Sequence, residues 1–280
     1  MRPKQTIPCR SVRFLTCLAA VSLCADGAAA QVTQSAAGQG SAPSTIRWNV
    51  EAGYESFWLR DVARATRPVD ASPVSWQGDG PAIAGRYDRA NPRRLHRFEF
   101  SFSSAGHFVY DAVVRTIPRS PDDRVVRVGG RYEYRRYPFR DLWIDGLDVG
   151  VGAQGIGEHL SLSRHMDPSI EIHESETQLG VAVVAAARFR RWRRLDLEVA
   201  WANGAFLSRN HEQHSVDSLA TVEGWGGGWL TDLSLMAGIP VSRRASILAS
   251  YLHTGQARYA SHDTYASGRS RILLGVRYGR

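Results

Sequence analysis

Arg97-Phe98-Glu99-Phe100-Ser101-Phe102-Ser103 is the stretch of sequence that decides the fold. Its phenylalanines alternate strictly with polar residues, which is the period-two pattern of a β-strand with one apolar and one polar face. Ten segments of the chain carry a version of this pattern: 47–58, 97–103, 107–115, 126–135, 147–154, 177–187, 195–202, 229–239, 245–253 and 271–278. The sequence therefore predicts an all-β protein.

The links between these segments alternate in length. The long links are 61–94, 157–174, 204–224 and 254–268, and the short ones are 103–106, 188–194 and 240–244. Two links fit less well, because 116–123 is short for its side and 138–146 is long for the other. Long loops on one side, tight turns on the other and an even number of strands indicate a barrel that spans a membrane. We predict a closed antiparallel transmembrane β-barrel of about 10 strands, with 8 or 12 as alternatives.

The last segment, Arg271-Ile272-Leu273-Leu274-Gly275-Val276-Arg277-Tyr278, is amphipathic in the same way. With these patterns, nearly all of the chain after residue 44 resembles the small outer-membrane β-barrels of Gram-negative bacteria. The resemblance implies a location in the outer membrane, contact with its lipid and lipopolysaccharide, and the barrel-assembly machinery as a partner during biogenesis. The chain departs from the family where Gly279 and Arg280 follow the terminal aromatic residue.

Residues 1–30 have the layout of an export signal. Four basic residues precede an apolar core at 14–24, and Ala28-Ala29-Ala30 form a small-residue cleavage site. One alternative is a permanent anchor, for which the core is short. Another is a lipoprotein signal on Cys24, although Leu23 stands before it where a small residue is expected. We expect a signal peptide at 1–30, a flexible lead-in at 31–44 and the barrel domain at 45–280.

Cysteine content and charge narrow the classes of function. All three cysteines lie within residues 1–30, so the exported chain has no disulfide, cysteine zinc site or cysteine nucleophile. Without the four basic residues and Asp26 of the leader, the formal net charge falls from +8 to +5. A sequence pI of 9.8 is compatible with nucleic-acid binding, but an exported chain rarely meets nucleic acid. We expect no nucleic-acid partner.

The polar faces of the predicted strands carry charges of both signs, and in a barrel they point into the lumen. The cations are Arg47, Arg97, Arg127, Arg131, Arg135, Arg271 and Arg277, and the anions are Glu51, Glu55, Glu99, Glu133, Asp148, Asp196, Glu198 and Asp232. Ten strands enclose little space, and an unpaired buried charge is costly. We therefore expect a narrow or plugged, ion-paired lumen rather than a broad diffusion pore.

Three of these arginines repeat on one face of a single strand. Arg127, Arg131 and Arg135 are compatible with a ladder that guides anions through a narrow channel. The alternative, which we favour because opposite charges are available, is pairing with acids on neighbouring strands such as Glu99 and Asp148.

Aromatic residues stand at or near the ends of the segments, as the interfacial girdles of a barrel require. They are Trp48, Trp58, Tyr110, Tyr132, Tyr137, Trp201, Trp225, Trp229 and Tyr278. The alternative for about half of them is an ordinary place in the core.

Most histidines fall in the long links, among acids. They are His159, His165, His173, His211, His214, His253 and His262. His211 and His214 are spaced for a metal only on a helical turn, and polar residues commonly gather in solvated loops. We expect no metal and no cofactor.

Two families of outer-membrane enzyme offer a direct test. Lipid A deacylases carry His-x-Ser at the end of the penultimate strand, and His253-Thr254-Gly255 resembles this motif except that glycine replaces the nucleophile. Omptin proteases use paired aspartates and an Asp–His couple, and here His262-Asp263 has no Asp-x-Asp partner. We assign no catalytic residue.

We therefore interpret the chain as a non-enzymatic barrel acting in surface interaction, envelope structure or limited small-solute passage. The alternatives are an outer-membrane lipid hydrolase with His253 as base, and a soluble periplasmic β-sandwich binding protein.

Overall fold

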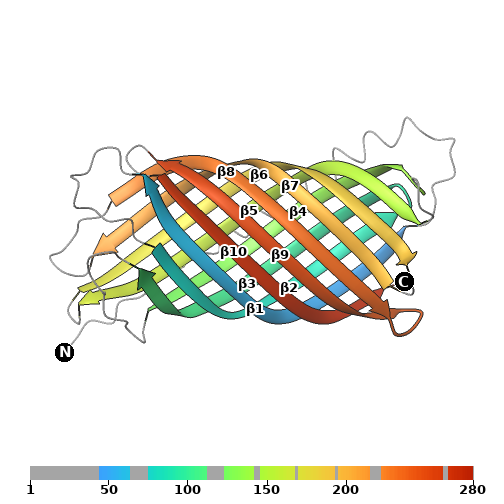
Figure 1. Ribbon diagram of the computed structural model, residues 1–280, viewed down its shortest axis with the longest axis horizontal. Helices are drawn as coiled ribbons and strands as arrows, with labels where there is room; N and C mark the ends of the chain where they lie inside the picture. Colours follow the sequence, from blue (N-terminus) through green and yellow to red (C-terminus); the bar gives the residue numbers. More distant parts are fainter. Residues whose placement is uncertain are drawn as a thin grey trace, which may run out of the picture. The chain divides into compact units, whose positions relative to one another are not determined.

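The computed structural model describes residues 44–63, 75–111, 123–141, 146–167, 170–192, 195–214, 222–260 and 264–279. They form ten antiparallel strands (Figure 1): β1 Thr45–Ala63, β2 Ser75–Asn91, β3 Arg94–Asp111, β4 Arg124–Phe139, β5 Leu147–Asp167, β6 Ile170–Trp192, β7 Leu195–His214, β8 Val222–Pro240, β9 Ala245–Ala260 and β10 Thr264–Gly279. No helix among these residues is long and apolar enough to cross a membrane.

The ten strands close into a barrel. Each strand pairs with the next in sequence, and β1 pairs with β10 with Trp48 opposite Tyr278. Closure leaves no unpaired sheet edge, which is what a sheet in lipid requires. The prediction of a closed antiparallel barrel of ten strands is confirmed.

The two ends of the barrel differ in their connections. One end of the barrel holds the start of β1 at Thr45 and the end of β10 at Gly279. At this end neighbouring strands are joined by the links 92–93, 140–146, 193–194 and 241–244. We call this the turn end. The links 64–74, 112–123, 168–169, 215–221 and 261–263 join strands at the opposite end, which we call the loop end.

The predicted strand number was right because two errors cancelled. Residues 75–91, predicted to lie in the long link 61–94, form β2. The segments 97–103 and 107–115, predicted as two strands with a turn at 103–106, belong to one strand, β3. Glycine and alanine occupy much of the inward face of β2, and a proline lies on its outward face, so its hydropathy does not alternate clearly.

The strands are also longer than predicted, at 16 to 23 residues. A tilted strand needs only about 9–11 residues to cross the hydrocarbon core. The predicted long links 157–174, 204–224 and 254–268 are mostly strand, because pairing continues beyond the region where the two faces differ in polarity. Hydropathy alternation marks the lipid-facing part of a strand and is weaker in the part that projects into water.

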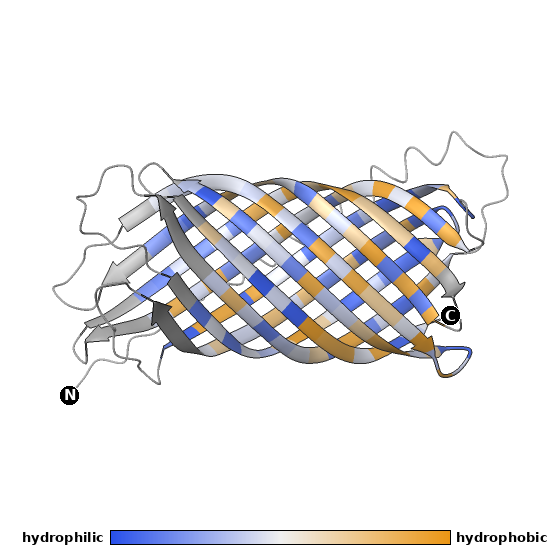
Figure 2. Ribbon diagram, viewed as in Figure 1, coloured by the Kyte–Doolittle hydropathy of each residue, from blue (hydrophilic) through white to orange (hydrophobic). Residues whose placement is uncertain are grey.

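The two faces of the sheet have opposite chemistry. Trp48, Phe100 and Leu274 are 59%, 50% and 64% exposed, whereas Arg135 and Asp148 are 1% and 0% exposed. A single closed sheet has only an inside and an outside, so the charged side chains are inside and the apolar ones outside. Figure 2 shows hydrophobic and hydrophilic residues interleaved along the strands. This is the reverse of a water-soluble β-sandwich.

The interior is not polar throughout. Small and aliphatic side chains of β6, β7 and β8 form an apolar patch on the inner wall, consisting of Ala182, Val184, Ala186, Ala200, Ala202, Phe206 and Leu230. A second apolar cluster nearer the loop end contains Phe57, Ala105, Val125 and Leu162. The charged side chains are therefore confined to part of the lumen.

The aromatic prediction needs one correction. Trp48, Trp58, Trp201, Trp225, Trp229 and Tyr278 are exposed on the outer surface, and Tyr132 is half-buried. Tyr137 instead points inward and is buried, with the guanidinium of Arg188 lying 4.3 Å from its ring centroid. A register shift between Arg136 and Phe139 lies beside it. The side chain of Tyr110 lies outside the described residues.

Candidate functional site: the charged lumen

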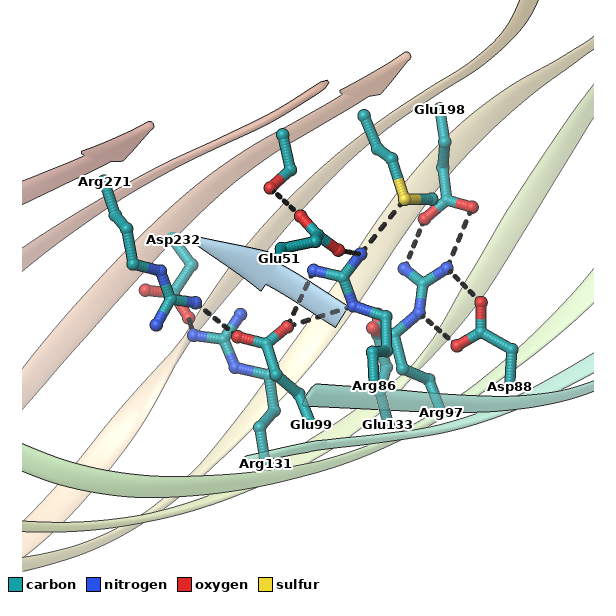
Figure 3. A network of polar contacts seen from close by, with 12 residues as sticks. Glu51, Arg86, Asp88, Arg97, Glu99, Arg131, Glu133, Glu198, Asp232 and Arg271 are labelled. Atoms are coloured by element: carbon teal, nitrogen blue, oxygen red, sulfur yellow. Dashed lines mark hydrogen bonds and ion pairs between the residues drawn. The ribbon is translucent and has the colours of Figure 1, made fainter. Parts of the chain in front are cut away.

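Buried and partly buried arginines and acids inside the barrel form three groups along its length. The turn-end cluster comprises Asp88, Arg97, Glu133, Arg135 and Glu198. The central cluster comprises Glu51, Arg86, Glu99, Arg131, Asp232 and Arg271. The loop-end cluster comprises Glu55, Arg127, Glu158 and Arg269. Figure 3 shows the central cluster beside Asp88, Arg97, Glu133 and Glu198 of the turn-end cluster.

The turn-end cluster is organised around Glu198 of β7. Its carboxylate accepts hydrogen bonds from Arg97 of β3, at 2.5 Å, and from Arg135 of β4, at 2.7 Å. Arg97 also binds Asp88 at 2.8 Å, and Arg135 also binds Glu133. Each guanidinium therefore faces two carboxylates, so neither buried cation is left without a counter-charge.

The central cluster balances its charges. Arg86 lies 3.0 Å from Glu51 and 2.9 Å from Glu99, and Arg271 binds the second oxygen of Glu99. Arg131 reaches Asp232 of β8 at 2.8 Å. Three arginines thus face three acids. Because each positive charge has a negative partner, the groups can stay ionised and the cluster carries no net charge.

The loop-end cluster spans the full width of the barrel. Arg269 of β10 lies 2.5 Å from Glu158 of β5, and four strands separate β5 from β10 in either direction around the sheet. Arg127 lies 3.3 Å from Glu55, which also accepts a hydrogen bond from Ser103 at 2.9 Å. The Arg269–Glu158 contact joins opposite walls, and the Arg127–Glu55 and Ser103–Glu55 contacts join strands on the same side of the barrel.

A small cavity of about 20 Å³ lies between the central and loop-end clusters. Its lining includes Glu99, Arg131, Glu158, Arg269 and Arg271. A cavity of this size holds about one water molecule.

The three arginines of the proposed ladder are all ion-paired. Arg127, Arg131 and Arg135, four residues apart on β4, each belong to a different cluster. Their partners differ from the acids suggested by the sequence, because Glu99 binds Arg86 and Arg271, and Asp148 lies 2.9 Å from Arg188. Glu55, Asp232 and Glu198 lie on strands that do not neighbour β4, whereas Glu158 of the adjacent β5 lies 4.0 Å from Arg127.

The remaining predicted lumen residues occupy the turn end. Asp148 is buried and binds Arg188, while Arg277 is buried and donates a hydrogen bond to the sulfur of Met236 at 3.1 Å. Arg47 and Asp196 are half-buried near this end. Neither Arg47 nor Asp196 belongs to the three clusters.

Sequence reasoning missed four members of the clusters. Arg86 and Asp88 lie on β2, within the predicted link 61–94, and Glu158 lies within the predicted link 157–174. Arg269 lies between the predicted link 254–268 and the predicted strand 271–278. A signal for β2 was present in the alternation of Arg86 and Asp88 with Ile83 and Tyr87. No comparable signal marks Glu158 or Arg269.

The outer wall carries a Ser–His contact. His253 Nδ1 lies 2.9 Å from Ser270 Oγ, and the two residues are direct partners on β9 and β10. Their neighbours Tyr259 and Ile272 on the same face are exposed. Gly255 and Gly268 pair one step nearer the loop end, and the Trp58 ring covers the Gly268 position. The serine beside His253 therefore comes from the next strand and not from the residues that follow the histidine.

The described residues contain no group of three or more His, Cys, Asp or Glu side chains arranged to hold a metal ion. Residues 211–214 form the end of β7 rather than a helical turn. The spacing that would suit a metal is therefore not realised there. His262 and Asp263 lie outside the described residues.

The barrel is similar in architecture to solved structures. The barrel is similar to the outer-membrane protease OmpT from Escherichia coli, with a TM-score of 0.64 and 11% identity, over 87% of this chain and 99% of that one. The fold is that of a bacterial outer-membrane β-barrel. The translocator domain of the autotransporter NalP from Neisseria meningitidis also matches, with a TM-score of 0.41 and 11% identity, over 94% of this chain and 97% of that one.

A third match is Neisserial surface protein A, with a TM-score of 0.34 and 8% identity, over 86% of this chain and 99% of that one. No protein-family model and no curated protein sequence matches the chain. At 11% identity the match to OmpT shows the fold alone and leaves function to the chemistry of the site.

Proposed function

We propose that this protein resides in the bacterial outer membrane with a lumen closed by ion pairs, and that it acts in envelope structure, surface interaction or limited passage of small solutes. The observation that carries this proposal is the contact between Arg269 and Glu158 on opposite walls, together with Arg97–Glu198 and Arg131–Asp232 between non-neighbouring strands. Side chains that meet across the bore leave no continuous wide path for water.

The energetics support a closed resting state. Removing one member of a buried ion pair costs about 3–5 kcal/mol, because the other charge is left uncompensated. Opening the bore requires several such contacts to separate together. Brief exchange of partners within a cluster is less costly and is compatible with slow passage of small ions, since several arginines contact two acids. These arginines are Arg86, Arg97, Arg127 and Arg135.

Conductance in planar lipid bilayers tests the closed lumen. We expect the wild-type protein to insert without steady open-pore current, and Glu158→Ser/Arg269→Ser, which deletes the contact across the diameter, to raise the conductance. Ser44→Ala, at an exposed position before β1, is the control and should behave as wild type. A large, stable conductance from the wild-type protein would refute the proposal.

Cell fractionation tests the location. A barrel with this outer surface is expected to require detergent for extraction and to show heat-modifiable migration on gels. Recovery of the protein in the osmotic-shock fraction without detergent would overturn the membrane location and favour a soluble periplasmic protein.

A second candidate function, hydrolysis of lipid acyl esters, is favoured by one contact on the outer wall. His253 Nδ1 is within hydrogen-bond distance of Ser270 Oγ, the arrangement that activates a serine nucleophile. Ser270 Oγ would attack the ester carbonyl while His253 takes its proton. The proton then leaves with the alcohol, and water hydrolyses the acyl-serine. Gly255 leaves space on the His253 side of the serine, whereas the Trp58 ring fills the position over Gly268.

Incubation with labelled lipid A or phospholipid separates this candidate from the closed barrel. It predicts release of acyl chains that stops in Ser270→Ala and in His253→Ala and persists in the control Ser56→Ala, which lies on the same face of β1 opposite Ser270. Absence of release by the wild-type protein ends the hydrolase candidate and leaves the closed-lumen proposal untouched.

A further inference from the structure

Aromatic side chains form a continuous row on the outer surface near the turn end. Tyr278, Trp48, Tyr87, Phe98 and Tyr132 are successive register partners across β10, β1, β2, β3 and β4. The ring centroids of Trp48 and Tyr87 are 4.6 Å apart, and those of Phe98 and Tyr132 are 4.7 Å apart. Such a row marks the boundary between hydrocarbon and headgroups. We call it the aromatic row.

Arginines lie just beyond the aromatic row, on the same outward face. Arg89 is two residues past Tyr87, while Arg94 and Arg136 are four residues past Phe98 and Tyr132. At about 3.3 Å per residue along a tilted strand, these side chains stand within about 5–13 Å of the row. The headgroup layer on each side of the hydrocarbon core is about 5–8 Å thick, so Arg89 lies within it and the long side chains of Arg94 and Arg136 reach back to it.

Two of these arginines face each other. Arg94 and Arg136 are direct register partners, and both are exposed. Like charges directly opposite each other on a sheet are destabilising. Within the described part of the chain, Arg89, Arg94 and Arg136 form no ion pair with an acid. Nearby, Asp88 is buried against Arg97, and the exposed Asp141 accepts the Gly146 N–H at 2.9 Å.

The turn between β2 and β3 fixes the position of this group. The Asn91 side-chain oxygen accepts the backbone N–H groups of Arg93, at 2.9 Å, and Arg94, at 2.7 Å. The backbone N–H of Tyr137 donates to the carbonyl of Arg93 at 2.8 Å, which ties the turn to β4. The backbone segments that carry Arg94 and Arg136 are therefore held side by side.

We propose that Arg89, Arg94 and Arg136 form a binding site for the phosphate headgroup of an anionic phospholipid in the leaflet at the turn end. A phosphate between Arg94 and Arg136 converts their repulsion into two charge-assisted contacts, and guanidinium groups match phosphate oxygens bidentately. The acyl chains of the same lipid would lie against the aromatic row. This inference rests on the membrane location proposed above.

Lipid retention in native mass spectrometry of the full-length protein tests the site. The folded protein in detergent is titrated with phosphatidylglycerol and, separately, with phosphatidylethanolamine, whose ammonium the arginines repel. We expect Arg94→Gln/Arg136→Gln to reduce the preference for phosphatidylglycerol about tenfold, because two exposed contacts are lost and each contributes about threefold. The control Arg243→Gln/Arg244→Gln removes the same charge from the exposed β8–β9 turn and is expected to change the preference by less than about twofold.

The outcomes separate this inference from the proposed location. An equal loss of preference in both variants, or no loss in either, would overturn the site while leaving the membrane location intact. A wild-type protein that stays in solution without detergent and retains neither lipid would overturn both.

A second test measures how Arg94→Gln changes the stability of the barrel in two kinds of vesicle. Only the proposed site predicts that this change has opposite signs in the two. Arg94→Gln removes the repulsion, so it is expected to stabilise the barrel in phosphatidylcholine vesicles. The same substitution is expected to destabilise the barrel in vesicles containing phosphatidylglycerol, where it removes a ligand contact. The same sign in both vesicles would refute the inference.

Discussion

Glu198 is the most informative single position in the lumen, because its carboxylate joins two arginines from different strands. In Glu198→Gln the amide oxygen still accepts one hydrogen bond, but both charge-assisted contacts, at 2.5 and 2.7 Å, are lost. Such contacts contribute about 1.5–3 kcal/mol each. Arg97 and Arg135 keep Asp88 and Glu133, which limits the damage. We expect the free energy of unfolding to fall by about 2–4 kcal/mol.

The assay is urea unfolding of the protein in lipid vesicles, followed by tryptophan fluorescence and checked by gel migration. A double-mutant cycle with Arg97→Met isolates the pair, and we expect a coupling energy of about 1.5 kcal/mol or more between residues in direct contact. A loss below about 0.5 kcal/mol, or additive effects of the two substitutions, would refute the buried ion-pair network.

Three other substitutions test the wall of the barrel. In Gly152→Ala the new Cβ would lie 1.9 Å from the Tyr134 carbonyl oxygen, so we expect a loss of about 1–3 kcal/mol in the unfolding free energy. Gly155→Ala, on the same strand with nothing within 4 Å, should change it by less than about 0.5 kcal/mol, and equal effects would contradict this packing. Ile83→Arg places a charge on the lipid face, level with Leu274, and should cost about 2–4 kcal/mol in vesicles. A neutral result there would mean that this face meets water.

The sequence predicted the fold wherever lipid imposes a difference between the two faces of a strand. Phe98, Phe100 and Phe102 alternate with polar residues because one face meets hydrocarbon and the other the lumen. In β2 the inward positions 78, 80, 82 and 84 are glycine or alanine, and Pro81 lies between them on the outward face. Neither composition nor alternation distinguishes such a segment from a loop.

The sequence predicted many of the charged residues that line the lumen but not which of them pair with each other. The inward charges follow from alternation once a strand is recognised, as for Arg131 and Glu133. Contacts across the lumen, such as Arg269 with Glu158, depend on barrel shear and tilt, which set the residues that share a level. The Ser270–His253 contact was missed for a related reason, because it depends on the register between β9 and β10.

The central claim is that the apolar face of the barrel wall points outward into lipid. Quenching of a fluorophore on that face by lipid tests this claim directly. All three cysteines lie within the first 24 residues, so Leu274→Cys in the chain lacking residues 1–30 carries a single thiol for a fluorophore. We predict that brominated acyl chains quench this label in vesicles and that aqueous iodide does not, with Arg243→Cys showing the opposite behaviour. Quenching of the Leu274→Cys label by iodide but not by brominated lipid would show that the apolar face does not meet the membrane.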